Sequence, residues 1–132
     1  MRVYIAAPWV DKHIAQEAAG QFELAGHTIT KAWWEHREVD SYLTDDTSND
    51  DELSQQATED WDGITSADVF VLLNSGKSEG KAVETGLALA MHNEGYWPGQ
   101  LFLVGKKSNL FHYLPEWQIC DNAREVIERL SR

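Results

Sequence analysis

A carboxylate near the start of a predicted helix, Glu84, is the residue of this chain best placed to do chemistry. It belongs to the segment 67–90, ADVFVLLNSGKSEGKAVETGLALA, in which the apolar run 69–73 predicts a buried strand and residues 74–80 predict a turn. A helix is expected over 81–92, with Glu84 in its first turn. Open α/β sheets bind ligands at the carboxyl ends of their strands, and a helix N-terminus keeps a carboxylate ionised near neutral pH. Such a group can act as a nucleophile or stabilise a sugar cation.

The surrounding elements decide whether other functional side chains reach Glu84, because acidic residues in first helical turns also have a purely structural explanation. Strands are predicted over 3–7, 28–33, 69–73, 101–104 and 117–120, and helices over 11–25, 51–66, 81–92 and 123–130. This alternation predicts an α/β fold, a flavodoxin-like or Rossmann-like three-layer sandwich whose parallel sheet has four to five strands in the order 2-1-3-4-5. The loops after strands one and three would then bring Tyr4, Trp9, Ser78 and Glu84 together.

The length, net charge and cysteine content of the chain argue against several classes of function. The 132 residues predict a single domain, residues 1–132, and the net charge of -11 argues against a nucleic-acid polymer as partner. A small phosphate held by backbone N–H groups stays compatible with that charge. The lone Cys120 excludes an internal disulfide and indicates a reducing, cytoplasmic location. The first apolar run is too short for a membrane span, so no membrane partner is expected.

Three segments together resemble one enzyme family. They are VYIAAPW at 3–9, DWDGI at 60–64 followed by Ala67 and Asp68, and GKAVETG at 80–86. The first is similar to a strand whose tyrosine faces a nucleophile, the second to a helix that supplies an active-site aspartate, and the third to a Gly-x-x-x-Glu-x-Gly signature. On these motifs the chain resembles the nucleoside 2-deoxyribosyltransferases and the related nucleoside 5′-monophosphate N-glycoside hydrolases.

The resemblance implies a catalytic set of Glu84, Asp60 and Tyr4. Glu84 would attack C1′ of the sugar and displace the base, leaving a glycosyl-enzyme ester that water or a second base resolves. Tyr4 would hydrogen-bond Glu84, and Asp60 would assist proton transfer at the base or contact the sugar. The resemblance implies no metal and no organic cofactor, a small-molecule nucleoside or nucleotide as substrate, and a homo-oligomer.

Six residues are expected to bind substrate: Ser78, Gly80, Trp9, Ala6, Asp62 and Trp33. Asp62 competes with Asp60, because residues two apart do not share a helical face and only one of them should enter the site. We favour Asp60, which matches the family spacing, while a pair of solvated helix acids is the structural alternative.

Ser78 bears on the substrate. Related hydrolases carry a serine at this position that contacts a 5′-phosphate, whereas the transferases carry an aspartate that binds sugar hydroxyls. Lys77 and Lys81 flank Ser78, and a Ser/Gly loop at a helix N-terminus can hold a phosphate. Alternatively, Ser78 only caps the helix. The first loop, residues 8–12, lacks the Gly-Ser-x-Arg pattern of the deoxynucleotide hydrolases, and its Asp11 is unfavourable for an anion.

The tryptophans are expected mainly in packing roles. Trp61 is predicted to lie in the core, and either Trp33 or Trp34 to face a base pocket, while Trp97 and Trp117 are candidates for a subunit interface.

The resulting expectation is hydrolysis of the N-glycosidic bond of a nucleoside or its 5′-monophosphate. Base exchange between deoxynucleosides and a non-catalytic nucleotide sensor are the two alternatives.

Overall fold

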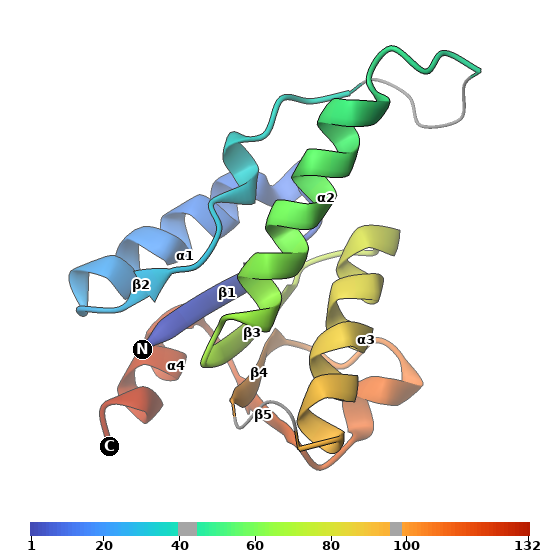
Figure 1. The fold of residues 1–132 in the computed structure, drawn as a ribbon. Helices are drawn as coiled ribbons and strands as arrows, with labels where there is room; N and C mark the ends of the chain where they lie inside the picture. Colours follow the sequence, from blue (N-terminus) through green and yellow to red (C-terminus); the bar gives the residue numbers. More distant parts are fainter. Residues whose placement is uncertain (40–44, 96–98) are drawn as a thin grey trace.

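The predicted α/β architecture is confirmed by the computed structural model, which describes residues 1–39, 45–95 and 99–132 (Figure 1). The strands are β1 (Arg2–Ala6), β2 (Thr28–Ile29), β3 (Val69–Asn74), β4 (Gln100–Gly105) and β5 (Trp117–Cys120). The helices are α1 (Lys12–Leu24), α2 (Asp50–Thr65), α3 (Glu79–Asn93) and α4 (Ala123–Leu130), with 3-10 turns η1 (Trp9–Asp11), η2 (Trp33–Glu35) and η3 (Leu110–Tyr113). The sheet is parallel in the order β2-β1-β3-β4-β5, so the switch point lies between β1 and β3 as predicted.

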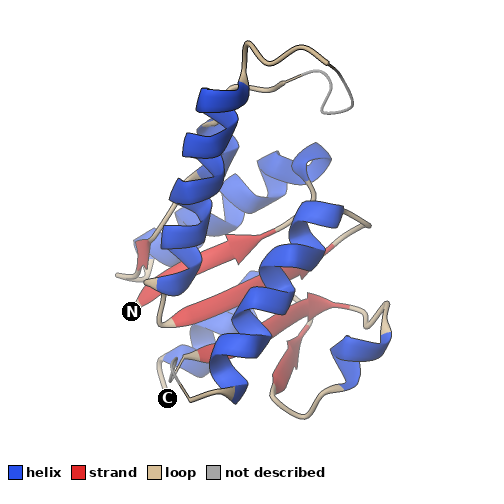
Figure 2. Cartoon of the chain, turned by 45° about the vertical axis from the view of Figure 1, so that its right-hand side comes forward, coloured by secondary structure: helices blue, strands red, loops and turns tan. Residues whose placement is uncertain are grey.

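Helices cover both faces of the sheet. Helices α1 and α4 pack together on one face, and α2 and α3 lie side by side on the other (Figures 1 and 2). Residues 69–73 of β3 are all buried, which explains why that strand reads as a continuous apolar run rather than an alternating one. Helix α1 ends before Gly26, whose φ of 92° suits only a residue without a side chain.

The second strand is shorter than the predicted 28–33. It pairs with β1 only through Thr28 and Ile29, and the chain then turns into η2. The indole N–H of Trp33 donates to the carbonyl of Ile5 at 2.6 Å, and the Trp33 and Trp34 rings pack edge to face at 5.6 Å. Both tryptophans are buried, so the packing of their side chains takes the place of further backbone pairing between β1 and β2.

Two predictions about tryptophans are wrong. Trp61 is 53% exposed, because α2 turns Gly63 and Ile64 towards the sheet and a residue two positions from Gly63 points away. Trp117 is buried in β5, with its indole N–H donating to the carbonyl of Phe111 at 3.0 Å. Trp97 lies outside the described residues.

Gly63 lets α2 lie close to Lys31 and to the Tyr4 ring of β1. A Cβ at this position would lie 2.8 Å from Lys31 Cβ and 3.2 Å from the Tyr4 ring. We expect Gly63→Ala to destabilise the protein by about 1–3 kcal/mol through overpacking, although alanine is the better helix former. Urea denaturation measures the change.

Gly20→Ala in α1 is the matched control, because nothing lies within 4 Å of a Cβ there. It should stabilise the protein by up to about 1 kcal/mol. Equal effects of the two substitutions would contradict the close approach.

Among the described residues, no helix is both long and apolar enough to cross a membrane.

Candidate active site

A cavity of about 610 Å³ opens at the carboxyl ends of β1 and β3. Six of the nine residues singled out from the sequence line it: Glu84, Asp60, Trp9, Trp33, Ser78 and Gly80. The remainder of the wall consists of Ala7, His36, Arg37, Glu38, Val39, Gln56, Glu79 and Lys81. The loops after β1 and β3 thus meet where the switch point places them.

Glu84 lines this cavity, and its hydrogen-bond partner Tyr4 is buried and does not line it. The Tyr4 hydroxyl donates to Glu84 Oε1 at 3.0 Å. The tyrosine is completely buried and its ring stacks on Phe70 of the adjacent strand at 5.9 Å. This packing holds the hydroxyl in place, so the orientation of the Glu84 carboxylate is set by a rigid neighbour.

The ionisation of Glu84 differs from the expectation. Helix α3 starts at Glu79, with Ser78 as its N-cap, so Glu84 lies in the second turn and beyond the strongest part of the helix dipole. Burial raises the pKa of Glu84 to about 8, and the negative charge of Asp60 adds to the increase, against the lowering effect of the Tyr4 hydrogen bond. Desolvation therefore outweighs the helix N-terminus, and burial favours the protonated carboxyl at neutral pH.

Asp60 is paired with His36, a residue that the sequence analysis did not single out. Asp60 Oδ1 lies 2.9 Å from His36 Nε2, and both side chains line the cavity. Burial raises the pKa of Asp60, while the hydrogen bond and charge of His36 oppose that increase. The two groups can hold a proton between them beside the cavity.

Asp62 and Ala6 do not line the cavity. Asp62 is exposed, since it lies two residues beyond Asp60 on α2 and projects to another side of the helix. Ala6 is fully buried within β1, and its neighbour Ala7 provides the lining instead.

Trp9 and Trp33 form the aromatic wall. Their ring centroids are 6.1 Å apart, and Trp33 is held by its hydrogen bond to Ile5. Trp9 is only half-buried, with the Lys12 ammonium 4.7 Å from its ring centroid. Trp9 is therefore the more accessible stacking surface for a planar group.

Hydrogen bonds that involve Ser78, Lys81 and Asp11 hold the loop before α3 in its conformation. Ser78 Oγ accepts the Lys81 backbone N–H at 3.3 Å, so the helix-capping role of Ser78 is present. The buried Lys81 ammonium donates to Asn74 Oδ1 at 2.8 Å and to the carbonyl of Gly76. Asp11 accepts from Ser75 at 2.7 Å, which brings the acidic residue of the first loop against this turn.

The segment 36–39 is clamped onto α2. Arg37 Nη2 donates to Glu52 at 2.6 Å and to Asn49 at 2.9 Å, and Gln56 donates to the Arg37 carbonyl at 3.3 Å. His36 and Arg37 escaped the sequence analysis because they lie in a polar stretch without periodicity, and their partners are 12 to 24 residues away.

Comparisons with known proteins concern the fold. No protein-family model matches the sequence, and no curated protein is significantly similar to it. The structure is similar to that of the Clostridium botulinum CMP N-glycosidase BcmB, with a TM-score of 0.57 and 18% sequence identity. The match covers 99% of this chain and 98% of that chain. The predicted resemblance is thereby confirmed at the level of the fold, which the two chains share from end to end.

Proposed function

We propose that this protein is a nucleoside 2-deoxyribosyltransferase-like N-glycosidase that hydrolyses the N-glycosidic bond of a nucleoside 5′-monophosphate or nucleoside. The observation that carries the proposal is the hydrogen bond from Tyr4 to Glu84, which lines a cavity of about 610 Å³, a volume that suits a ligand of this size. The fold shared with a CMP N-glycosidase supports this reaction class.

Glu84 is the nucleophile of the proposed reaction. One carboxylate oxygen attacks C1′ as the bond from C1′ to the base nitrogen breaks, and the electron pair of that bond leaves with the base. The transition state has oxocarbenium character, which the carboxylate stabilises electrostatically. Water then attacks C1′ of the glycosyl ester as the bond from C1′ to the Glu84 oxygen breaks, and its proton passes to Asp60, which has given its own to the base, so the sugar is released and the Glu84 carboxylate is regenerated.

Asp60 and His36 supply the proton that the departing base requires. The departing base nitrogen needs a proton, and the Asp60–His36 pair can supply one from beside the aromatic wall. Asp60 is the proposed acid towards the base, and His36 is a positioning residue that acts through Asp60. Trp9 stacks on the base.

Ser78 is the proposed phosphate contact. It lines the cavity at the N-terminus of α3, where backbone N–H groups favour an anion. Asp11, bonded to Ser75 in the same loop region, works against a phosphate, so the free nucleoside stays the alternative substrate.

A substrate panel tests the function. The protein is incubated with ribo- and deoxyribonucleosides and their 5′-monophosphates, and base release is followed by chromatography. Release from monophosphates, without an added acceptor base, supports the hydrolase. Release only in the presence of an acceptor base identifies a transferase, and saturable binding without release identifies a nucleotide sensor.

Tyr4→Phe should shift the pH dependence of the reaction. The Tyr4 hydrogen bond lowers the pKa of Glu84, so its loss makes the carboxylate harder to ionise. We expect the ascending limb of kcat/KM to move to higher pH by roughly one to two pH units, because a hydrogen bond to a charged group contributes about 1.5–3 kcal/mol. Tyr113→Phe, at an exposed position away from the cavity, is the control and should leave the limb in place.

We also propose that residues 1–132 act as one domain in a cytoplasmic homo-oligomer. Two exposed apolar side chains, Trp61 on α2 and Val83 on α3, support self-association. Sedimentation velocity measures the oligomeric state.

A further inference from the structure

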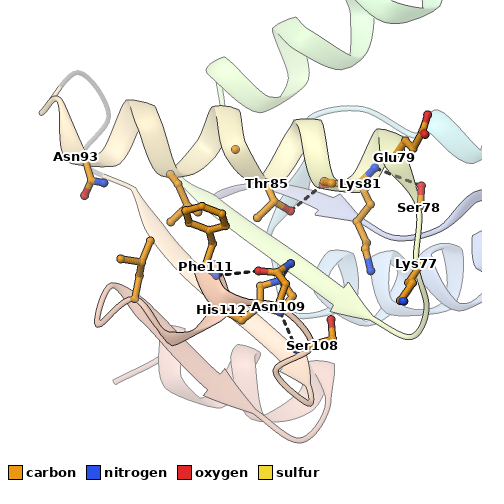
Figure 3. Close-up of a pocket in the computed structure, with 14 residues that line it drawn as sticks. Lys77, Ser78, Glu79, Lys81, Thr85, Asn93, Ser108, Asn109, Phe111 and His112 are labelled. Carbon is orange, nitrogen blue, oxygen red and sulfur yellow. Dashed lines mark hydrogen bonds between the residues drawn. The ribbon is translucent and has the colours of Figure 1, made fainter.

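A second cavity, of about 1010 Å³, lies on the other side of the α3 N-terminus, between α3 and η3 (Figure 3). It shares Ser78, Glu79 and Lys81 with the candidate active site but contains none of the catalytic residues proposed above. Its walls are largely apolar, with Leu89, Phe111 and Leu114 among them, and three buried polar residues also line it: Lys81, Thr85 and His112.

Lys81 and Thr85 are accounted for by the fold, because Lys81 bonds to the loop before α3 and the Thr85 hydroxyl donates to the Lys81 carbonyl at 2.8 Å. His112 is different. It is 2% exposed, and a hydrogen-bond donor faces each of its ring nitrogens: the Ser108 backbone N–H lies 3.0 Å from Nδ1, and the Asn109 amide nitrogen lies 3.2 Å from Nε2.

Two backbone N–H groups determine which side-chain atoms of His112 and Asn109 are hydrogen-bond donors and which are acceptors. Because Ser108 N–H can only donate, Nδ1 of His112 must accept, and the ring proton must lie on Nε2. Because Phe111 N–H donates to Asn109 Oδ1 at 2.9 Å, the other side of the Asn109 amide is its NH2 group. Burial and the charge of Lys81 lower the pKa of His112, which keeps the ring neutral with a single N–H.

The result is two donors, His112 Nε2–H and Asn109 Nδ2–H2, facing one another 3.2 Å apart with no hydrogen-bond acceptor for either among the described residues. Figure 3 shows the Asn109 amide next to the His112 ring in the space between η3 and α3. The Asn109 side chain is exposed, whereas His112 is buried, and a buried donor without a partner is unfavourable, so the Nε2–H of His112 calls for an acceptor oxygen from outside the chain.

The surrounding charge indicates that this acceptor is anionic. The chain carries a net charge of -11, yet four of its 11 basic residues gather at the carboxyl ends of β3 and β4: Lys77, Lys81, Lys106 and Lys107. Lys77 and Lys81 line the cavity itself, with Glu79 as the one carboxylate in its lining. A local positive potential in an acidic protein concentrates anions.

We propose that this cavity binds an oxyanion attached to an apolar or aromatic body, with His112 and Asn109 as its hydrogen-bond donors. The oxyanion accepts from both donors, and the apolar body lies along Leu89, Phe111 and Leu114. The cavity shares Ser78, the proposed phosphate contact, with the candidate active site, but it contains none of Tyr4, Asp60 and Glu84, so the proposal does not depend on the glycosidase chemistry.

Phenyl phosphate is the probe, because it joins an oxyanion to an aromatic ring. Protein labelled with 15N-histidine reports on the two cavities separately, since His112 lies in this cavity and His36 in the candidate active site. We expect the free protein to show His112 as the Nε2–H tautomer, and phenyl phosphate to shift its Nε2–H resonance saturably. An Nδ1–H tautomer, or a titration that moves only His36, would overturn the proposal.

Asn109→Asp is the decisive variant. Its carboxylate preserves the cap to Phe111 N–H and accepts from His112 Nε2–H, so it replaces the missing acceptor from within. We expect a higher melting temperature without ligand and at least about tenfold weaker binding of phenyl phosphate. Asn122→Asp, at the N-cap of α4, is the matched control and should bind as the wild type does.

Two further measurements use the Glu84→Gln variant and benzyl alcohol. Glu84→Gln should retain phenyl phosphate binding at His112, whatever its effect on base release. Failure of this binding site and failure of the glycosidase proposal are therefore distinguishable. Equal affinity of Asn109→Asp and wild type would reject the donor pair as the binding group. Benzyl alcohol, which lacks the anion, should bind far more weakly, and equal binding would reject an oxyanion site.

Discussion

Replacing Glu84 with glutamine is expected to reduce base release by at least about 10³-fold while the protein stays folded. Glutamine preserves the size of the side chain, and its amide oxygen can still accept from the Tyr4 hydroxyl, which lies 3.0 Å from Glu84 Oε1 in the wild type. It cannot form the glycosyl ester, because an amide is not a nucleophile of comparable strength. Single-turnover assays on the best substrate of the panel measure the loss.

The control for this variant is Glu94→Gln, at the C-cap of the same helix and exposed. It removes one negative charge of the same kind without touching the cavity, so kcat/KM should be unchanged. If Glu84→Gln retained base release, Glu84 would be excluded as the nucleophile, and Asp60 would be the next carboxylate to test.

The same substitution should stabilise the protein at alkaline pH. The ordinary pKa of a glutamate is 4.5, and burial raises that of Glu84 to about 8 in the folded state. Between these two values the folded protein binds a proton that the unfolded chain has released, so the free energy of unfolding falls as the pH rises through this window. Below it both states are protonated, and above it both are ionised.

Glutamine does not titrate, so the advantage of Glu84→Gln over wild type should grow from about pH 5 to pH 8 and then level off, reaching a few kcal/mol. Urea denaturation at pH 5, 6.5, 8 and 9 measures it. Glu94→Gln should track the wild type at every pH. A constant difference between Glu84→Gln and wild type would show that Glu84 ionises normally in the fold.

Together these two expectations describe a site that lowers stability for the sake of reactivity. The carboxylate proposed to attack C1′ is desolvated in the fold, which makes its charge costly. Tyr4 reduces that cost through one hydrogen bond, and Asp60 increases it through its charge. In the proposed reaction, the oxocarbenium character that develops at C1′ would stabilise this negative charge.

Much of the fold was predictable from local patterns. The apolar run at 69–73 and the alternation of elements predicted the sheet order 2-1-3-4-5, because buried parallel strands and amphipathic helices leave their periods in the sequence. The meeting of the loops after β1 and β3 then follows from the topology. The length of β2 was not predictable, because the Trp33 indole bond to the Ile5 carbonyl depends on contacts across 28 residues.

By itself, the sequence predicted which segments face the switch point and pointed to Glu84, Tyr4 and Ser78 by their positions, while Asp60 came from the resemblance to an enzyme family. Only the tertiary structure decided how these groups are surrounded. The His36 partner of Asp60, the raised pKa of Glu84 and the exposure of Trp61 all depend on residues distant in the chain. The paired donors of His112 and Asn109 likewise became visible only once burial and two backbone N–H groups were known. The physical reason is that periodicity is a local property, whereas desolvation and hydrogen-bond polarity are set by whatever the fold brings into contact.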